Sequence, residues 1–351
     1  MNAEPLHEAR ARLDAGGRLL ITRLRYIGDV VLSLPLVHAL RRAFPHAELH
    51  YLADRPALAV LEEHPDLDRL WTHERGVGPG LRLAAALRRQ RFDAVVDLFC
   101  NPRSALLTRA SGAPVRIGER RRLRRVLYTQ ARRLPAGRSA LQQHLDAGTL
   151  LGAKNAAERG PRLHLSPEER SRGRAHVDAA RRVQPLVVVH LAATQPEKEW
   201  PLELALAFVQ RLLDADIGVY LTRAPHRTLP SEAVAAREPR LRVLPELPLR
   251  ELLGVLAVAD AVVSVDGAIA HCSVALERPT LALFGPTDAA VWFPYAEFGA
   301  YRVLRAHANC AACAGASRAH TCMAALSVET VATELRALLD AARRQQGTAS
   351  R

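Results

Sequence analysis

The sequence is poor in the features that mark membrane-spanning and disulfide-stabilised proteins. It contains no run of about 18 apolar residues, so no transmembrane helix is predicted. Its first residues lack the basic-then-apolar order of a signal peptide. Five cysteines in a chain without such a leader argue against a disulfide framework. We therefore expect a cytoplasmic protein whose stability comes from packed cores.

Several enzyme motifs are absent as well. No Gly-x-x-x-x-Gly-Lys-Ser/Thr occurs, which excludes a P-loop, and neither half begins with Gly-x-Gly-x-x-Gly after its first predicted strand, which disfavours a dinucleotide dehydrogenase. The chain also lacks His-Glu-x-x-His and the Gly-x-Ser-x-Gly elbow of serine hydrolases. The function must rest on other residues.

Positive charge is abundant, and arginine supplies nearly all of it. The net charge is +13, with 49 lysines and arginines against 36 acidic residues. Part of this usage fits a GC-rich genome; the alternative is an anionic partner, namely nucleic acid, an acidic lipid surface or a phosphorylated substrate. Residues 115–133 hold eight arginines and one acid. This stretch is either an ordinary solvated basic helix or a binding surface for anions.

Strand-like and helix-like segments alternate twice along the chain. Strands are predicted at residues 18–25, 48–53 and 93–99, and again at 185–191, 217–222 and 262–265. Helices are predicted between them, including residues 30–44, kinked at Pro35, and residues 56–64. This order predicts an α/β protein with two doubly wound parallel sheets. The expected domains are residues 1–163 and 164–326, followed by a closing helix and tail at 327–351.

Two glycine–carboxylate turns lie where a strand passes into a helix. Gly28-Asp29 follows the first strand, and a carboxylate at that helix N-terminus is either a simple N-cap or a general base for a substrate hydroxyl. Asp266-Gly267 repeats the pattern in the second half, next to helix N–H groups suited to an anion. Lys198 suits a phosphate, although most lysines in such loops are merely solvated, and a lone histidine such as His271 is more often a packed, hydrogen-bonded residue than a catalyst.

The C-terminal region contains cysteines at a spacing seen in metal sites. Cys310 and Cys313 are followed by Cys322, with His307 and His320 close by. A zinc site needs four convergent ligands, and no second Cys-x-x-Cys is present. Buried or loop thiols are the alternative interpretation.

In combination, these segments resemble glycosyltransferase family 9, the heptosyltransferases of lipopolysaccharide core assembly. The resemblance covers nearly the whole chain and depends on the order and spacing of its motifs. They are Arg-Leu-Arg-Tyr-Ile-Gly-Asp-Val-Val-Leu-Ser-Leu-Pro at 23–35, Phe-Pro at 44–45, His-Pro-Asp-Leu-Asp at 64–68, Lys-Glu-Trp-Pro at 198–201, Asp-Gly-Ala-Ile-Ala-His at 266–271, Phe-Gly-Pro-Thr-Asp at 284–288 and the cysteine-bearing tail that ends with Cys-Met-Ala-Ala-Leu-Ser-Val-Glu at 322–329. The first and fifth motifs are nearer to the branch that resembles heptosyltransferase III.

The resemblance implies a GT-B fold, with two Rossmann-like domains across a cleft, and an inverting reaction that needs neither a metal nor another cofactor. Asp29 would be the base, acting on a hydroxyl of the anionic lipopolysaccharide inner core, and ADP-heptose the donor. The implied donor-binding residues are Thr194, Lys198, Asp266, Gly267, Ala268, His271, Gly285 and Thr287. The acceptor-binding residues would be Gly28, Arg120, Arg121 and Arg124, with transient contact at the cytoplasmic face of the inner membrane.

Two departures from the family pattern leave the donor open. Gly267 stands where relatives often have Ser or Thr, and the stretch after Thr222 lacks a glutamate that some relatives use to hold the nucleotide ribose. A GT-B transferase that uses another nucleotide-sugar on a different surface glycan is the main alternative. A basic nucleic-acid-binding protein is not expected, because residues 115–133 contain a single aromatic residue, Tyr128.

Overall fold

A computed structural model describes residues 4–121, 123–154, 157, 159–177, 185–222, 238–306 and 322–349. Contacts divide the chain into two compact units, residues 1–164 and 165–351. Each unit is built on one six-stranded sheet in which every pair of neighbouring strands is parallel. No helix in the described ranges is both long and apolar enough to cross a membrane.

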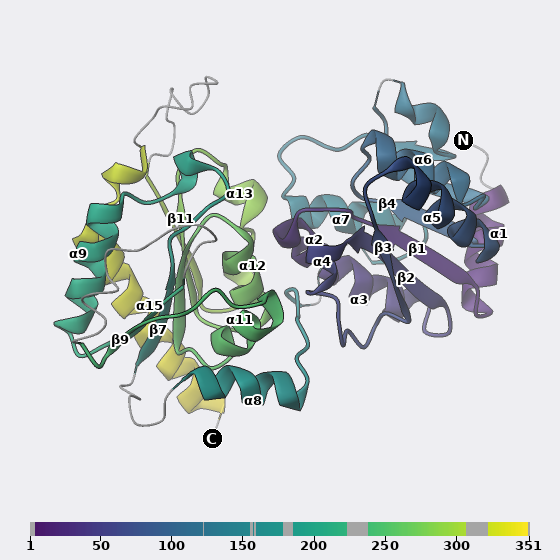
Figure 1. The fold of residues 1–351 in the computed structure, drawn as a ribbon. Coiled ribbons are helices and arrows are strands. Elements are labelled where there is room, and N and C mark those ends of the chain that lie inside the picture. The colour runs from purple at the N-terminus through teal and green to yellow at the C-terminus, as the bar shows by residue number, and fades with distance from the viewer. Residues whose placement is uncertain are drawn as a thin grey trace. The chain divides into compact units, whose positions relative to one another are not determined.

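The N-terminal unit has the strand order β3-β2-β1-β4-β5-β6 (Figure 1). Its strands are β1 (Arg18–Thr22), β2 (Glu48–Asp54), β3 (Arg69–His73), β4 (Ala94–Asp97), β5 (Val115–Glu119) and β6 (Gln130–Arg132). Its helices are α1 (Glu4–Asp14), α2 (Ile27–Leu32), α3 (Leu34–Ala43), α4 (Arg55–Leu58), α5 (Val77–Arg89), α6 (Pro102–Ala110), the 3-10 turn η1 (Arg124–Leu127) and α7 (Ala140–Thr149). Leu87 of α5 and Leu107 of α6 pack on Leu20 and Val95 of the sheet, while α7 packs on α2 and α3.

The C-terminal unit has the corresponding order β12-β11-β10-β7-β8-β9. Its strands are β7 (Leu186–His190), β8 (Gly218–Leu221), β9 (Leu241–Val243), β10 (Ala261–Val265), β11 (Thr280–Phe284) and β12 (Tyr301–Arg305). Its helical segments are α8 (Pro167–His176), η3 (Pro196–Lys198), α9 (Leu202–Leu213), α11 (Leu249–Leu256), α12 (Ala268–Ala275), α13 (Ala289–Trp292), η4 (Ala296–Phe298), η5 (Cys322–Ala325) and α15 (Val328–Ala349). Helices α9 and α15 lie on one side of this sheet and α11 and α12 on the other (Figure 1).

Both strand orders reverse direction at one point in the sheet. In the N-terminal unit this switch falls between β1 and β4, which pair from Leu19 with Ala94 to Thr22 with Asp97. In the C-terminal unit it falls between β7 and β10, where Ser264 lies opposite His190. Ligands of open α/β sheets bind beside the carboxyl ends of the strands at such a switch. The two switch points are therefore where each unit's functional residues are expected.

The structure corrects several predicted elements. Residues 30–44 are not one kinked helix: α2 ends at Leu32, and α3 begins at Leu34 with Pro35 in its first turn. Proline is accommodated there because the first helical N–H groups have no partner inside the helix. The expected turn at Gly28-Asp29 is the first turn of α2, and the helix predicted at 56–64 is only α4.

The arginine-rich stretch is also different from the basic helix considered for it. Residues 115–133 form β5, η1 and β6. The arginines hid these strands: β6 is the edge strand of the sheet, and Arg116 of β5, the strand beside it, is only partly buried, so neither strand reads as a continuous apolar run. Arg116 of β5 donates hydrogen bonds to the carbonyl oxygens of Leu127 and Ala113, which ties the strand to the segment that follows it.

Candidate functional site

Asp29 lies at the N-terminus of α2, directly after the loop that leaves β1. Its side chain is only 12% exposed and pairs with the guanidinium of Arg23. Its Oδ2 accepts a hydrogen bond from the Tyr26 backbone N–H at 3.1 Å, which caps the helix from its third position. The capping interpretation of this residue is therefore correct in part, and the carboxylate is held in one orientation at the switch point.

Arg23 is the residue here that the sequence did not reveal as part of a site. Besides pairing with Asp29, it donates to the Leu98 carbonyl oxygen at 2.8 Å, and its guanidinium lies 5.1 Å from the centre of the Phe99 ring. It thereby connects the ends of β1 and β4. The available signal was its position as the first residue of the family motif at 23–35, which gave it no role of its own.

Asp97 ends β4 and is fully buried. One carboxylate oxygen accepts the backbone N–H groups of Phe99 and Cys100, at 3.0 and 2.9 Å, and the other accepts the Tyr128 hydroxyl at 2.8 Å. Burial raises the pKa of Asp97, and its hydrogen bonds to these donors oppose that rise. These hydrogen bonds hold the loop after β4, whose Leu98 carbonyl oxygen accepts from Arg23, so Asp97 supports the site without facing it.

His144 of α7 is a second residue that sequence patterns did not identify. It is buried, and burial together with the positive charge of Arg23 lowers its pKa to about 3. A neutral imidazole thus lies within electrostatic reach of the Arg23–Asp29 pair. It adds no positive charge that would compete with Arg23 for the carboxylate.

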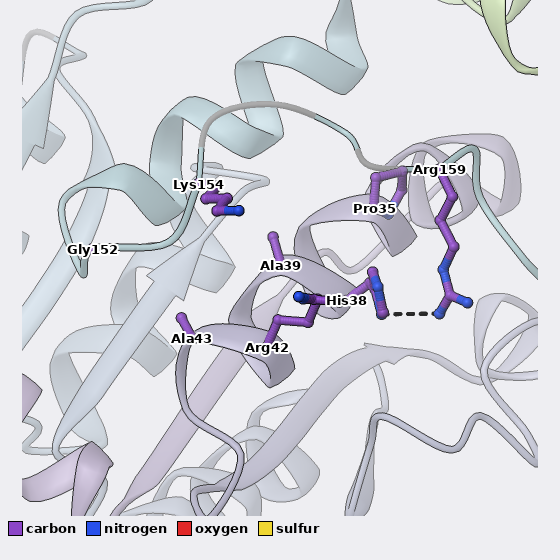
Figure 2. A pocket seen from close by; sticks show the side chains of 8 residues that line it. All are labelled: Pro35, His38, Ala39, Arg42, Ala43, Gly152, Lys154 and Arg159. Atoms are coloured by element: carbon purple, nitrogen blue, oxygen red, sulfur yellow. Dashed lines mark hydrogen bonds between the residues drawn. The ribbon is translucent and has the colours of Figure 1, made fainter.

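A pocket of about 210 Å³ lies between α3 and the chain that follows α7 (Figure 2). It is lined by Pro35, His38, Ala39, Arg42, Ala43, Gly152, Lys154 and Arg159. His38 Nδ1 lies 3.0 Å from Asp66 Oδ2 and 2.9 Å from Arg159 Nη2. Since Arg42, Lys154 and Arg159 are cationic, the lining favours an anionic group such as a phosphate or carboxylate. The lining comes from two segments, residues 35–43 and 152–159, which are more than 100 residues apart, so no local sequence pattern marked the pocket.

The arginines predicted to bind the acceptor lie at the β5–η1 end of the N-terminal unit. The side chains of Arg120 and Arg121 are exposed, and Arg121 Nε lies 2.6 Å from Glu119 Oε2. Arg124 begins η1 and is half-buried, and its Nε is buried with no hydrogen-bond partner among the residues that the structure describes. Gly28 is buried in the first turn of α2.

In the C-terminal unit, Lys198, Asp266 and Thr287 come together. Lys198 ends η3 beyond β7, Asp266 directly follows β10, and Thr287 follows β11. Lys198 Nζ lies 2.7 Å from Asp266 Oδ2, and the Thr287 hydroxyl donates to the same oxygen. The Asp266 side chain is 7% exposed and that of Lys198 19%. Three strand ends thus converge on one ion pair at the switch point.

The N-terminus of α12 lies next to this ion pair. Gly267 is the N-cap and Ala268 the first helical residue. The φ of Gly267 is 174°, an extended conformation that any residue adopts, and a Cβ there would meet only Val265 O at 3.8 Å. The backbone therefore does not require glycine. His271, in contrast, is buried and its Nδ1 lies 2.8 Å from the Tyr295 hydroxyl, as a packed histidine would.

Of the other two predicted donor-binding residues in this unit, one is exposed and one is buried. Thr194 is exposed in the loop before η3. Gly285 is buried, and a Cβ on it would come within 2.8 Å of Met323 Sδ, so close packing explains the glycine. His190, which sequence patterns missed, ends β7 with Nδ1 2.6 Å from the Thr222 hydroxyl, and burial lowers its pKa to about 4.

The cysteine cluster is only partly described. Cys310 and Cys313, together with His307 and His320, lie outside the described residues, as does the stretch after Thr222 in which a glutamate was sought. Cys322 is buried in the core that β10 and β11 share with α15. Within the described ranges, no three His, Cys, Asp or Glu side chains gather closely enough to hold a metal ion.

Sequence comparison relates the chain to one family. A model of glycosyltransferase family 9 (heptosyltransferase) matches residues 80–324, more than half of the chain. The chain is 25% identical over 289 residues to lipopolysaccharide heptosyltransferase 3 of Escherichia coli, covering 78% of this chain and 84% of the relative. It is 26% identical over 291 residues to lipopolysaccharide heptosyltransferase 1 of Escherichia coli K12, covering 77% and 88%. With such similar identities, the heptosyltransferase III-like branch stays a prediction.

Structural comparison agrees on the fold. The structure of Escherichia coli heptosyltransferase WaaC with ADP-2-deoxy-2-fluoro heptose matches with a TM-score of 0.72 and 23% identity, over 91% of this chain and 99% of that chain. The expected α/β fold class, GT-B with two doubly wound parallel sheets, is confirmed.

Proposed function

Since the chain belongs to glycosyltransferase family 9 and is a glycosyltransferase, we propose that it transfers a heptose from ADP-heptose to a hydroxyl of the lipopolysaccharide inner core. The observation that carries the proposal is the largely shielded, oriented carboxylate of Asp29 at the switch point of the N-terminal sheet. The related WaaC structure contains a fluorinated ADP-heptose, which supports this donor.

Asp29 is the general base in the proposed reaction. It takes the proton of the acceptor hydroxyl while the oxygen forms a bond to the anomeric carbon, and the bond from that carbon to the diphosphate breaks with ADP as the leaving group. Attack from the side opposite the diphosphate inverts the anomeric centre. Arg23 and the Tyr26 N–H each engage one carboxylate oxygen and so aim the base.

The donor's diphosphate is assigned to the C-terminal switch point. Lys198 supplies a positive charge, and the first N–H groups of α12 at Gly267 and Ala268 supply donors; Thr287, whose hydroxyl donates to Asp266, borders the same position and could turn its hydroxyl to the donor. These groups would stabilise the charge that grows on the leaving diphosphate. Asp266 holds Lys198 in place and lies where a sugar hydroxyl could donate to it. Thr194 and Gly285 border this region in the proposal, and His271 supports α12 from within.

The acceptor is assigned to the N-terminal unit. Arg120, Arg121 and Arg124 are suited to the phosphates and carboxylates of the inner core, and Gly28 precedes Asp29 in the first turn of α2. The basic pocket beside α3 is a further position for an anionic group of a large acceptor. Such an acceptor is carried by the cytoplasmic face of the inner membrane, where we place the enzyme, and the proposed steps use no cofactor or metal.

The test is turnover of ADP-heptose with a truncated inner-core acceptor, comparing the wild type with Asp29→Asn. The amide cannot accept the proton, so kcat should fall by about 10²- to 10⁴-fold with little change in the KM of the donor. Asp54→Asn is the matched control, since Asp54 also lies at the carboxyl end of a strand of the same sheet, as the last residue of β2, but pairs with His73 at 2.7 Å. Full transfer by Asp29→Asn would show that another group is the base.

Gly267 is the observation that favours a different nucleotide-sugar. It removes a hydroxyl that relatives often place beside the donor, although the backbone would accept a side chain. The same assay with other nucleotide-sugars separates the two possibilities. If only another donor is consumed, and Asp29→Asn abolishes that reaction, the heptose is wrong while the mechanism stands.

A further inference from the structure

Exposed aliphatic side chains gather on three neighbouring elements of the N-terminal unit. Of the eight large apolar side chains exposed in the described residues, five lie on α5, α6 and the segment at η1, with exposures between 59% and 83%. They are Val77, Leu81, Leu106, Leu123 and Val126. The same elements already bury other apolar residues, such as Leu87, Leu107 and Tyr128, in the core. The exposed set is thus additional to what packing requires.

The three elements form one layer on the sheet. Helix α5 packs against α6, and α6 packs against η1 (Figure 1 shows α5 beside α6). Val77 and Leu81 are four residues apart and share one side of α5. Since Leu87 and Leu107 point to the sheet, the exposed residues of α5 and α6 lie on the outer side of this layer.

Positive charge surrounds these aliphatic residues. Residues 75–133 contain 15 arginines and three acidic residues, Asp93, Asp97 and Glu119. Each acidic residue is engaged inside the unit: Asp93 by the Arg18 N–H, Asp97 by the hydrogen bonds described above and Glu119 by Arg121. The exposed arginines on the layer include Arg82, Arg103, Arg109 and Arg125. We call the five aliphatic residues and these four arginines the apolar–basic surface.

We propose that the apolar–basic surface docks the enzyme on an anionic lipid bilayer. The aliphatic side chains enter the boundary between headgroups and acyl chains, and the guanidinium groups pair with lipid phosphates. Nucleic acid does not suit the surface, because Phe92 and Tyr128 are buried and no exposed aromatic ring in the layer's described residues offers a stacking platform. A second copy would bring two arginine-rich faces together.

The inference extends the proposed function by naming the surface that meets the membrane carrying the acceptor. It can be tested without donor or acceptor, so it can fail while the transferase proposal stands, and the reverse also holds. The experiment is co-sedimentation of the full-length chain with vesicles of phosphatidylglycerol and phosphatidylethanolamine, and with vesicles of phosphatidylcholine, at about 0.1 M sodium chloride. Binding to the anionic vesicles alone is expected.

Three variants dissect the surface. Val77→Ser with Leu81→Ser, and Leu123→Ser with Val126→Ser, should each weaken binding by roughly tenfold, because serine removes the inserted apolar group. Changing Arg103, Arg109 and Arg125 to serine should weaken it by about a hundredfold, at about fivefold for each arginine. Leu123→Trp provides a direct readout, since its fluorescence should shift to the blue when anionic vesicles are added.

Two matched controls come from the C-terminal unit. Leu202→Ser removes an exposed aliphatic residue, and Arg172→Ser with Arg174→Ser removes two exposed arginines of α8; neither should change binding. The proposal is overturned if the wild type does not bind anionic vesicles, or if only the arginine variant loses binding. A dimer that is abolished by Leu123→Ser in ultracentrifugation would overturn it too, because a second copy would then cover the surface.

Discussion

The N-terminal unit should lose stability as the pH falls from 7 to 5, because His64 is buried as a neutral imidazole. His64 is 6% exposed, and its Nδ1 accepts the Asp66 backbone N–H at 3.2 Å. Its ring meets that of His164 edge to face, with centroids 5.1 Å apart. Burial, and then the proximity of His164, lowers the pKa of His64 from its ordinary 6.5 to about 4.

The sign and size of this loss of stability follow from proton linkage. Between pH 6.5 and about 4 the unfolded chain protonates His64 and the folded chain does not, so the free energy of unfolding falls as the pH decreases through this window. One pKa unit corresponds to about 1.36 kcal/mol, and pH 5 lies about 1.5 units below the unfolded pKa, so His64 accounts for about 2 kcal/mol. His144, with a pKa of about 3, lowers the free energy of unfolding by a similar amount over the same pH interval. A total of about 4 kcal/mol is large against a typical domain stability of about 5–15 kcal/mol.

Urea unfolding at pH 7 and pH 5 measures this loss. Trp71 of β3 reports on the N-terminal unit in a background that carries Trp200→Phe and Trp292→Phe. His64→Gln keeps an oxygen acceptor for the Asp66 N–H but does not titrate, so the difference between the two pH values should shrink by about 2 kcal/mol.

His46→Gln, at an exposed position of the same unit, is the control and should leave the difference unchanged. An equal pH dependence in His64→Gln and its parent would refute the reasoning, because His64 would then titrate alike in the folded and unfolded chains.

Further outcomes are expected at other sites. Gly173→Ala should lower the free energy of unfolding by about 3 kcal/mol in thermal unfolding, because its Cβ would lie 2.1 Å from the Gly254 carbonyl carbon where α8 meets α11. The control Gly80→Ala has open space around the new Cβ and should not destabilise the protein. Equal losses in the two variants would contradict the packing argument. Gly267→Ser should keep stability within about 0.5 kcal/mol, since the extended backbone accepts serine and the hydroxyl can cap α12; a large loss would mean that the glycine is structurally required. Lys198→Gln should weaken ADP binding in calorimetry by about tenfold or more, and unchanged affinity would remove the lysine from the diphosphate site.

The central strands could be read from the sequence, but several edge strands could not. The runs that became β7 and β10 are continuous and β-branched, as expected for strands covered on both faces. Strands β5 and β6 were missed because arginines such as Arg116 and Arg132 interrupt their apolar pattern. Both arginines are only partly buried, Arg116 in the strand next to the edge and Arg132 in the edge strand itself, a setting that local sequence does not specify.

The candidate site was predictable only where its residues lie in local motifs at strand ends. Asp29, Lys198 and Asp266 follow strands in recognisable motifs, and parallel topology brings such strand ends together. The pairing of Asp29 with Arg23, the burial of His144 and the contact between His190 and Thr222 depend on side chains that meet only in the folded units. No spacing in the sequence predicts those tertiary contacts.

The sequence by itself determined the alternation of strands and helices, the excess of arginine and the carboxylates that follow the strands. Only the tertiary structure decided which apolar residues stay exposed and which charges are paired. Leu87 and Leu81 of α5 are both leucines of one amphipathic helix, yet one is buried and the other faces solvent. Hydrophobic periodicity shows which residues can be buried, whereas the neighbouring elements determine which ones are covered.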